Sequence, residues 1–399
     1  MLAVLTTHPI QYQVPIWKLL ASRGRVPLKV YYLSDAGLRA HHDPGFGRQV
    51  AWDIDLLGGY DHASAKVRTS AQQSSFWWLR LSEDIAARAR DEGATTLWVQ
   101  GWQVAAYWQA ARQAGAQGLE LWLRGETNLK STGRSKLSFA KKLVLSTFLK
   151  RFDRFLCIGE ANRQFYLSRG INAERLASAP YCVDNAYFAE QAAVLRLRRA
   201  QLRARWAIPP EAFCALFVGK LIPKKRPLDL VAAAARLAGE KPIHLLFVGS
   251  GELDPAVREG CAAAYDAGQS PAALGRSMRP AASFAGFLNQ SEIAAAYVAA
   301  DVLVLPSEAT ETWGLVVNEA MACGLPVIVS DACGCSDDLV VPHRPDLCFP
   351  AGDIDALAAS LRSVMRAPPT QAELAHIISQ YDVTRTVENV EQLYLSGNT

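Results

Sequence analysis

Two glutamates eight positions apart frame the segment of this sequence best suited to chemistry. They bound the run Glu311-Thr312-Trp313-Gly314-Leu315-Val316-Val317-Asn318-Glu319. A short apolar run, typical of a strand, precedes this segment, and a helix is predicted from Gly314 onward. The first amides of a helix have no intrahelical partner and lie at the positive end of its dipole. We therefore expect the amides of Gly314, Leu315 and Val316 to bind an anion.

The two carboxylates indicate what kind of anion this is. Glu319 lies one helical turn after Leu315, and helical side chains lean toward the N-terminus, so its carboxylate faces the same opening. A carboxylate there repels phosphate but accepts hydrogen bonds from a neighbouring diol. Glu311 can accept from a second set of hydroxyls. Sugars on both sides of a phosphate describe a nucleotide sugar. The alternative is an ordinary amphipathic helix with a solvated Glu319.

A basic loop after another apolar run supplies the complementary charge. The segment reads Phe217-Val218-Gly219-Lys220-Leu221-Ile222-Pro223-Lys224-Lys225. Cations at the end of a strand can close on a diphosphate and neutralise it as a leaving group without a metal. We expect Gly219, Lys220 and Lys225 to do so. A solvated basic loop with no ligand is the alternative.

Two glycine turns complete the set of candidate donor-site residues. Gly249 and Gly251 flank Ser250 after the run Phe247-Val248, and Gly286 precedes Phe287 and Leu288. Glycine lets a ligand approach the backbone closely, and Phe287 or Leu288 can line the pocket of a flat base. Each turn alone is a weak signal, but the order and spacing of all four segments form a strong one.

The elements that position these segments alternate between strands and helices. This pattern predicts an α/β fold with largely parallel sheets. The expected strands are Leu2–Thr6, Leu28–Leu33, Thr96–Gln100, Glu120–Leu123, Phe155–Ile158, Cys214–Val218, His244–Val248, Val302–Leu305 and Val327–Ser330. The expected helices include Gln13–Ser22, Ser82–Glu92, Trp102–Ala114, Leu228–Leu237, Gln290–Val298, Gly314–Cys323 and Val383–Leu395.

The length of 399 residues favours two domains, since single hydrophobic cores stop growing well below that size. We expect an N-terminal acceptor-binding domain (1–185), a C-terminal donor-binding domain (186–380), and a final helix (381–399) returning to the first domain. The loop Thr7–Gln13 after the first strand contains no glycine. A GxGxxG dinucleotide site is therefore excluded there, and a simple NAD dehydrogenase is disfavoured.

Together the four segments resemble the retaining GT-B glycosyltransferases of family 4, the glycosyl transferases group 1. That family has a G-R-L-x-P-x-K-G loop, a V-G-x-G turn, an F-x-G-x segment and an E-x7-E motif. Here Lys220 stands where arginine is usual, and Trp313 stands where phenylalanine is usual. The resemblance covers residues 155–350 well and the first 150 residues poorly.

The resemblance implies two tandem Rossmann-like domains with a cleft between them, and roles for the matched residues. Lys220 and Lys225 would bind the diphosphate, aided by the amides at Gly314 and Leu315. Glu319 would hold the ribose, and Glu311 the donor sugar, so that Glu311, Lys225 and Lys220 are the candidate catalytic residues.

The implied reaction is a front-face transfer of the sugar to an acceptor hydroxyl with retained configuration. No Asp-x-Asp motif occurs in residues 155–350, so we expect neither a metal nor a cofactor beyond the nucleotide-sugar co-substrate. A GT-B-fold epimerase acting on a nucleotide sugar and a non-catalytic nucleotide-sugar-binding protein are the alternatives.

The first half supplies candidates for the acceptor side. His8 and Gln11 follow the first strand, and Arg124, Glu126 and Asn128 follow the strand that ends at Leu123. A histidine that many relatives place after this strand is absent here, so Glu126 becomes a candidate proton acceptor. For His8, a turn histidine before Pro9 is the structural alternative.

The net charge and the hydropathy of the sequence limit the kinds of partner that the protein can bind. The net charge of +4 is too small to argue for nucleic acid, and no apolar stretch is long enough to span a bilayer. A glycan, a lipid-linked or a small-molecule acceptor is expected. A basic amphipathic helix at 136–154 can rest on an anionic membrane surface, although a docked surface helix is the alternative. Scattered cysteines and the absence of a signal peptide predict a cytoplasmic protein, with peripheral contact to the inner face of the membrane.

Overall fold

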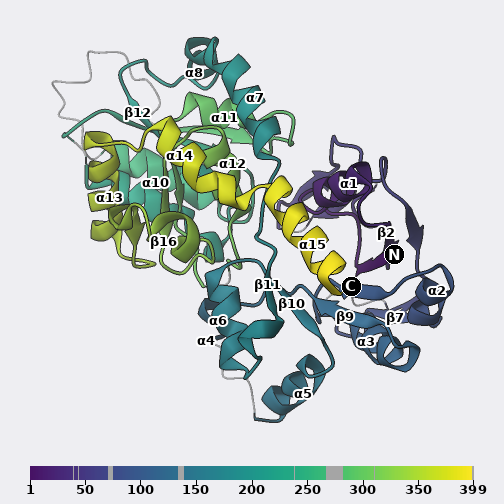
Figure 1. Ribbon diagram of the computed structural model, residues 1–399. Helices are drawn as coiled ribbons and strands as arrows, with labels where there is room; N and C mark the ends of the chain where they lie inside the picture. The colour runs from purple at the N-terminus through teal and green to yellow at the C-terminus, as the bar shows by residue number, and fades with distance from the viewer. Residues whose placement is uncertain are drawn as a thin grey trace. The chain divides into compact units, whose positions relative to one another are not determined.

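The chain folds into two compact α/β units in a computed structural model (Figure 1). The structure describes residues 1–38, 40–43, 45–70, 75–133, 139–237, 239–266, 282–309 and 311–397. Unit 1 comprises Met1–His41, Ile54–Cys182 and Asp382–Thr399, and unit 2 comprises His42–Asp53 and Val183–Tyr381. Each unit has its own parallel sheet covered by helices, which confirms the predicted architecture of two Rossmann-like domains.

Unit 1 contains a seven-stranded sheet in the order β11-β10-β9-β8-β1-β2-β5, with every pair parallel. Its strands are β1 (Leu2–Thr6), β2 (Leu28–Tyr32), β5 (His62–Ser64), β8 (Thr96–Val99), β9 (Glu120–Leu123), β10 (Arg154–Cys157) and β11 (Leu176–Ser178). An antiparallel pair is formed by β6 (Val67–Thr69) and β7 (Leu79–Leu81).

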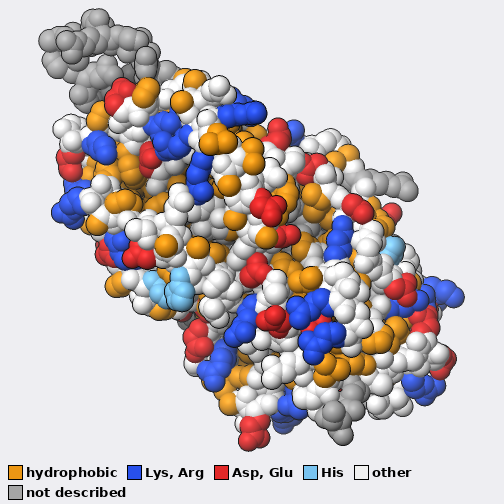
Figure 2. Space-filling view, turned by 45° about the horizontal axis from the view of Figure 1, so that its top comes forward, with side chains coloured by type: hydrophobic (Ala, Val, Ile, Leu, Met, Phe, Trp, Pro, Cys, Tyr) orange, Lys and Arg blue, Asp and Glu red, His pale blue; other side chains and the backbone are white. Residues whose placement is uncertain are grey.

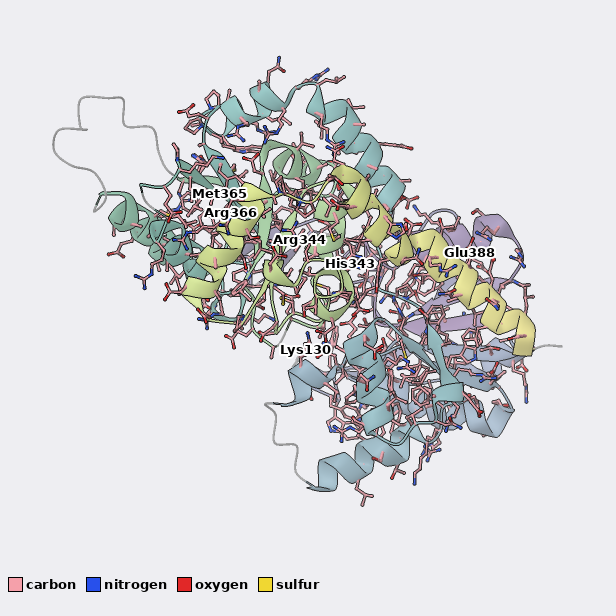
Figure 3. All side chains as sticks on the ribbon, turned by 60° about the vertical axis from the view of Figure 1, so that its left-hand side comes forward. Lys130, His343, Arg344, Met365, Arg366 and Glu388 are labelled. Carbon is pink, nitrogen blue, oxygen red and sulfur yellow. The ribbon has the colours of Figure 1, made fainter. Side chains whose placement is uncertain are left out.

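The helices of unit 1 include the last one of the chain. They are α1 (Val14–Arg23), α2 (Ile85–Asp91), α3 (Ala105–Gln117), α4 (Leu129–Gly133), α5 (Phe139–Leu149), α6 (Glu160–Ser168), η1 (Ala173–Arg175) and α15 (Val383–Gly397). On α15 the buried Glu391 pairs with Arg23 and Arg25 at 3.2 and 3.0 Å. Glu388, labelled in Figure 3, pairs with Arg23 at 3.7 Å, so α15 is held against α1 by charge as well as by packing.

Tryptophans fill one side of the unit 1 sheet. Trp98 and Trp122 stand at paired positions of β8 and β9, and Trp17 of α1 meets Trp98 edge-on at 5.2 Å. All three side chains are fully buried. Large aromatic side chains contribute strongly to core packing, so these three residues serve the fold rather than a ligand.

Unit 2 contains a six-stranded parallel sheet in the order β14-β13-β12-β15-β16-β17. Its strands are β12 (Phe213–Val218), β13 (Ile243–Val248), β14 (Ala282–Gly286), β15 (Val302–Leu305), β16 (Val327–Ser330) and β17 (Cys348–Phe349). All residues of β12, β13, β15 and β16 are buried. The sequence predicted the ends of these four strands to within one residue.

Helices surround this second sheet. They are α7 (Asn185–Arg196), α8 (Arg199–Arg205), η2 (Pro223–Lys225), α9 (Pro227–Ala235), α10 (Asp254–Asp266), α11 (Ile293–Ala299), α12 (Leu315–Ala322), η4 (Ser336–Val340), η5 (Pro345–Leu347), α13 (Ile354–Arg366), α14 (Gln371–Ile378) and η6 (Ser379–Tyr381).

A small two-stranded element from the N-terminal half belongs to unit 2. It is formed by β3 (His41–Asp43) and β4 (Arg48–Val50). Residues 42–53, hereafter the 42–53 segment, cluster with unit 2 although they lie within the predicted 1–185 domain. No local pattern in the sequence marks this association, because its partners are about 180 to 240 residues further along the chain.

Charges of both signs are interspersed on the face of the molecule in Figure 2. This distribution is in keeping with the small net charge of +4. Among the described helices, none combines the length and apolarity needed to cross a bilayer.

Candidate functional site

The four predicted donor-site segments meet at one edge of the unit 2 sheet. Because β12, β13, β14 and β15 are parallel, the loops that follow them all leave from the carboxyl edge. Gly219, Gly249 and Glu311 lie in the loops that follow β12, β13 and β15, and Gly286 is the last residue of β14. Ligands of open α/β sheets bind at this edge, outside the carboxyl ends of the strands.

Glycines allow the loops to touch backbone to backbone. The Gly219 amide donates to Val248 at 2.9 Å, and the Gly249 amide donates to Gly286 at 2.7 Å. Gly249 has φ +124°, and a Cβ atom added to it would lie 1.9 Å from the carbonyl oxygen of Gly219. A Cβ on Gly251 would lie 2.5 Å from the carbonyl oxygen of Leu221. The turn therefore needs glycine at both positions to bring the β12 and β13 loops into contact.

Lys225 and Glu311, both predicted from the sequence, form an ion pair. Lys225 ends η2, and its Nζ donates to the Glu311 carboxylate. The backbone supports the pair, since the Glu308 amide donates to the Lys224 carbonyl at 2.9 Å. Their side chains are 18% and 15% exposed, so both charges are largely shielded but reachable. A shielded cation beside a carboxylate can bind a phosphate and a sugar hydroxyl next to each other.

The helix start predicted at Gly314 is present in α12. Gly314 caps it with φ +106°, and a Cβ there would lie 2.6 Å from Leu305 Cδ2. Leu315 and Val316 are partly exposed, whereas Val317 is buried and its amide donates to the Gly314 carbonyl at 2.9 Å. The amides of Leu315 and Val316 thus begin the helix at a partly open position, as an anion site requires.

Glu319 is buried on α12, and a solvated surface glutamate, the sequence-based alternative, is wrong. Tyr297 of α11 donates its hydroxyl to the Glu319 carboxylate. A carboxylate so shielded is held in one orientation, so it can accept hydrogen bonds from a diol with little loss of freedom. Sequence reasoning missed Tyr297, which has no motif and lies 22 residues before Glu319.

Lys220 makes a contact that sequence reasoning did not anticipate. Its ammonium donates to both carboxylate oxygens of Asp43 at 2.8 and 2.9 Å. Burial alone raises the pKa of Asp43, but the hydrogen bond and charge of Lys220 and the amides of Gly45 and Phe46 outweigh burial and lower the pKa. Asp43 is therefore ionised at neutral pH.

The predicted base-site residues Phe287 and Leu288 are partly buried after β14. The Phe287 ring meets Phe46 edge-on at a centroid distance of 5.1 Å and Trp52 at 6.3 Å. Both aromatic neighbours come from the 42–53 segment, which therefore reaches the same loops as the predicted donor.

The acceptor-side candidates lie in unit 1, at the carboxyl edge of its sheet. His8 is partly buried, and its Nδ1 lies 3.0 Å from the Thr7 hydroxyl. Gln11 is partly buried in the same loop. The buried Gln13, two residues later, receives a hydrogen bond from Thr6 at 3.3 Å, so the loop is tied to the end of β1.

The side chains of Arg124 and Asn128 form hydrogen bonds within unit 1. The buried Arg124 guanidinium donates to the carbonyls of Ala179 and Pro180 at 3.2 and 3.3 Å. The Asn128 side chain is buried and accepts from the Ser131 amide at 2.8 Å, which stabilises the start of α4. Neither side chain offers an open surface to an acceptor.

Glu126 is exposed and stays the accessible candidate of the three. It accepts a hydrogen bond from the buried Tyr181 hydroxyl. Burial raises the pKa of Tyr181 far above its ordinary value, and the neighbouring Glu126 charge adds to the effect. The tyrosine therefore stays protonated and fixes the carboxylate, a positioning role that the sequence does not reveal.

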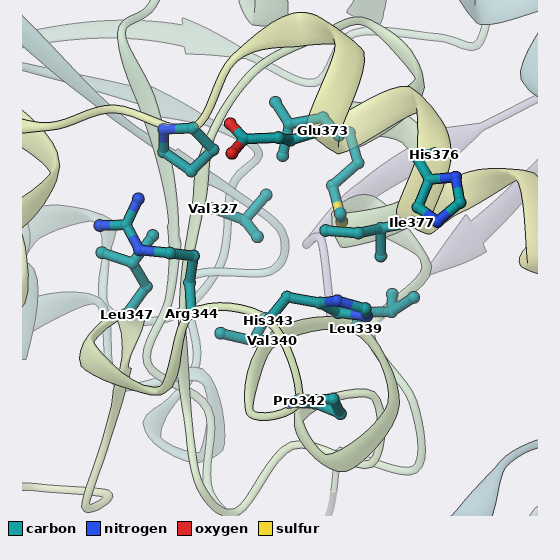
Figure 4. A pocket seen from close by; sticks show the side chains of 13 residues that line it. Val327, Leu339, Val340, Pro342, His343, Arg344, Leu347, Glu373, His376 and Ile377 are labelled. Carbon is teal, nitrogen blue, oxygen red and sulfur yellow. The ribbon is translucent and has the colours of Figure 1, made fainter.

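A separate cavity of about 330 Å³ lies elsewhere in unit 2. Figure 4 shows Glu373 and His376 of α14 facing His343 and Arg344, which are also labelled in Figure 3. Val327, the first residue of β16, lines it, so the cavity lies toward the amino edge of the sheet. It is therefore distinct from the carboxyl-edge site.

Known sequences are similar to the part of the chain that carries these motifs. Residues 198–381 match the family described as Glycosyl transferases group 1. A GDP-mannose-dependent alpha-mannosyltransferase of Mycobacterium tuberculosis is 34% identical over 230 residues, which are 57% of this chain and 50% of the relative. A D-inositol 3-phosphate glycosyltransferase of Thermomonospora curvata is 32% identical over 182 residues, 43% of this chain and 39% of the relative. The chain thus spans half or less of the length of these relatives.

Solved structures resemble the whole chain at low sequence identity. A glycosyltransferase from Rickettsia africae superposes with a TM-score of 0.71 at 13% identity, covering 98% of this chain and 97% of that one. The Anabaena protein HepE, in complex with UDP-glucose, gives a TM-score of 0.67 at 16% identity, with 99% of each chain covered. These similarities establish the fold, which is GT-B.

Proposed function

Through residues 198–381 the chain resembles the group 1 glycosyltransferases, and we propose that it transfers a sugar from a nucleoside diphosphate sugar to an acceptor hydroxyl. The observation that carries this proposal is the Lys225–Glu311 pair beside the start of α12. Buried Glu319 lies one helical turn further on. These groups supply a cation for phosphate and carboxylates for hydroxyls on one sheet edge.

The proposed reaction proceeds on one face of the donor sugar. The acceptor oxygen forms a bond to the anomeric carbon while the bond from that carbon to the diphosphate breaks on the same side. The departing diphosphate takes the acceptor proton. The configuration is retained because the new bond forms on the face that the diphosphate leaves. Lys225, Lys220 and the first amides of α12 stabilise the leaving charge, which grows in the transition state. Because these groups carry the charge, the transfer needs no metal, and we expect turnover to survive EDTA.

A donor screen tests the proposal. UDP-, GDP-, ADP- and dTDP-sugars are added singly, and thermal stability is measured. Bound donor raises the melting temperature as its concentration exceeds the dissociation constant. The name of the mycobacterial relative makes GDP-mannose the first choice. A glycosyltransferase consumes its donor with an acceptor present, an epimerase converts it without one, and a binding protein does neither. No stabilisation by any donor would contradict the proposal.

Replacing Glu319 by glutamine is expected to weaken nucleotide binding by about tenfold or more, since a hydrogen bond to a charged acceptor contributes ~1.5–3 kcal/mol. Glutamine keeps an acceptor for Tyr297, so the fold should persist. Calorimetric titration measures the affinity for UDP and GDP and for their 2′-deoxy forms. The wild type should discriminate against the deoxy form, and Glu319→Gln should not. Equal discrimination by both proteins would place the ribose elsewhere.

We also propose contact of α5 with an anionic membrane surface from the cytoplasmic side. Leu143 and Val144 on this helix are 59% and 55% exposed, and Lys150 and Arg151, which follow it, are exposed as well. Residues 136–138 of the predicted 136–154 helix lie outside the described residues, and the predicted end is wrong, since α5 ends at Leu149 and Arg154 begins β10. Exposed apolar and cationic side chains together favour an anionic lipid interface. The protein would then meet a lipid-linked acceptor at the membrane surface that carries this acceptor.

The double substitution Leu143→Asp, Val144→Asp should reduce binding to phosphatidylglycerol vesicles at least tenfold, because it removes apolar contact and adds like charge. Vesicle sedimentation measures the bound fraction, with phosphatidylcholine vesicles as the uncharged reference. The control is Val194→Asp, since Val194 on α7 is 61% exposed and equally apolar. Equal losses in both variants would argue against a specific role for α5.

A further inference from the structure

The 42–53 segment contacts the residue that the proposed donor diphosphate needs. Lys220 donates to both oxygens of Asp43, and its ammonium lies 4.9 Å from the centroid of the Phe46 ring. Gly45 packs on the lysine stem so closely that a Cβ there would lie 2.7 Å from Lys220 Cδ. One turn of this segment thus contacts both the ammonium and the stem of Lys220. The Asp43 carboxylate therefore occupies the ammonium that the function proposed above assigns to the donor phosphate.

The same segment covers the predicted base site. The rings of Phe46 and Trp52 pack against Phe287, and the Arg48 guanidinium lies 5.4 Å from the centroid of the Phe287 ring. A flat nucleobase would require the same aromatic surface, because base recognition in such pockets uses the faces and edges of rings.

Hydrogen bonds to the neighbouring loops hold the segment in this position. Ser250, in the glycine turn after β13, donates to the Phe46 carbonyl at 2.7 Å. Asn289, after β14, donates to the Ala51 carbonyl at 2.7 Å. Ser291 donates its hydroxyl to Asp53. The segment is therefore anchored to the loops that follow β12, β13 and β14.

We propose that the 42–53 segment is an intramolecular occupant of the donor site, with Asp43 in the place of the donor phosphate and Phe46 and Trp52 in the place of the base. The donor then binds by displacing it. This inference rests on the function proposed above and adds a means of regulating the same site. The apparent affinity for donor is reduced by the fraction of molecules in which the segment is seated.

The ion pair that holds the 42–53 segment is weak enough for a ligand to displace the segment. Lys220 and Asp43 are 32% and 22% exposed, and a partly exposed ion pair is held weakly. A diphosphate carries more charge and more acceptor oxygens than one carboxylate, so it can compete for the lysine. The competition removes charge-assisted hydrogen bonds from Asp43 and forms new ones to the nucleotide.

The substitution Asp43→Asn tests the inference in the full-length protein. Asparagine still offers an oxygen to the Gly45 and Phe46 amides, which donate to Asp43 Oδ1 at 2.8 and 3.2 Å, but it loses the charge that holds Lys220. By titration calorimetry, we expect UDP or GDP, whichever binds, to bind about 3- to 10-fold more tightly. Phe46→Ala should also tighten binding.

The matched control is Glu240→Gln. Glu240 pairs with Arg362 through three hydrogen bonds in the same unit, on the loop that precedes β13 at the opposite edge of the sheet. It should leave nucleotide affinity unchanged. A loss of affinity in Asp43→Asn would overturn the inference, because it would make Asp43 a donor-binding group.

Hydrogen exchange provides a second readout on the wild type. Saturating nucleotide should accelerate exchange at the amides of Gly45, Phe46 and Gly47, all of which donate to Asp43. If nucleotide binds without this acceleration and with equal affinity for Asp43→Asn, the inference fails and the proposed function stands. If UDP and GDP bind neither the wild type nor the variants, both fail.

Discussion

Replacing Lys225 by methionine should lower kcat/KM for the donor by about 10²- to 10³-fold, the usual effect of removing one preorganised charge or donor from a developing oxyanion. Methionine keeps much of the side-chain volume and removes the ammonium. The loss has a second component, since Glu311 is left in a largely shielded position without its cation. Steady-state kinetics with the donor found by the screen measures the change.

Lys224→Met is the control for this prediction. Lys224 is the exposed neighbour in the same 3-10 turn and loses the same charge, so its substitution should change kcat/KM less than twofold. The double variant Lys225→Met, Glu311→Gln should lose less than the product of the single effects, because the two side chains contact each other. Equal losses in Lys224→Met and Lys225→Met would indicate only a general effect of charge.

Gly249→Ala should destabilise unit 2 by about 3–5 kcal/mol, because it adds backbone strain and a steric clash at one site. The φ of Gly249 is +124°, and the new Cβ would lie 1.9 Å from the Gly219 carbonyl oxygen, which is backbone and has no rotamer to change. The β12 and β13 loops would have to separate. Thermal unfolding followed by circular dichroism should show a melting temperature lower by about 10 °C.

The control Gly239→Ala separates the cost of backbone strain from the cost of a steric clash. Gly239 also has a positive φ, +90°, but nothing lies within 4 Å of a Cβ built there. Only the conformational cost of about 1 kcal/mol is then expected. If both variants lose the same stability, the close approach of the two loops is not what requires glycine at position 249.

The sequence by itself determined the architecture of the C-terminal half. Buried runs such as Cys214–Val218 and Val302–Leu305 are apolar and bounded by turn residues. The local sequence is therefore sufficient to predict that they form strands. Because parallel strands place their following loops on one edge, the sequence positions of Gly219, Gly249 and Glu311 were enough to predict that they meet. Short edge strands such as β5 and β17 carry too few residues for a pattern to be recognised.

The tertiary structure alone decided which charges pair. Three lysines follow β12, and only the path of the chain through η2 brings Lys225, rather than Lys220 or Lys224, to Glu311. Lys220 is paired instead with Asp43, 177 residues away, and Glu319 is joined to Tyr297 of another helix. Local spacing cannot encode such contacts, because they depend on which elements pack together. The sequence placed the predicted donor-site motifs on one edge of the sheet, and the folded chain brought the 42–53 segment into contact with them.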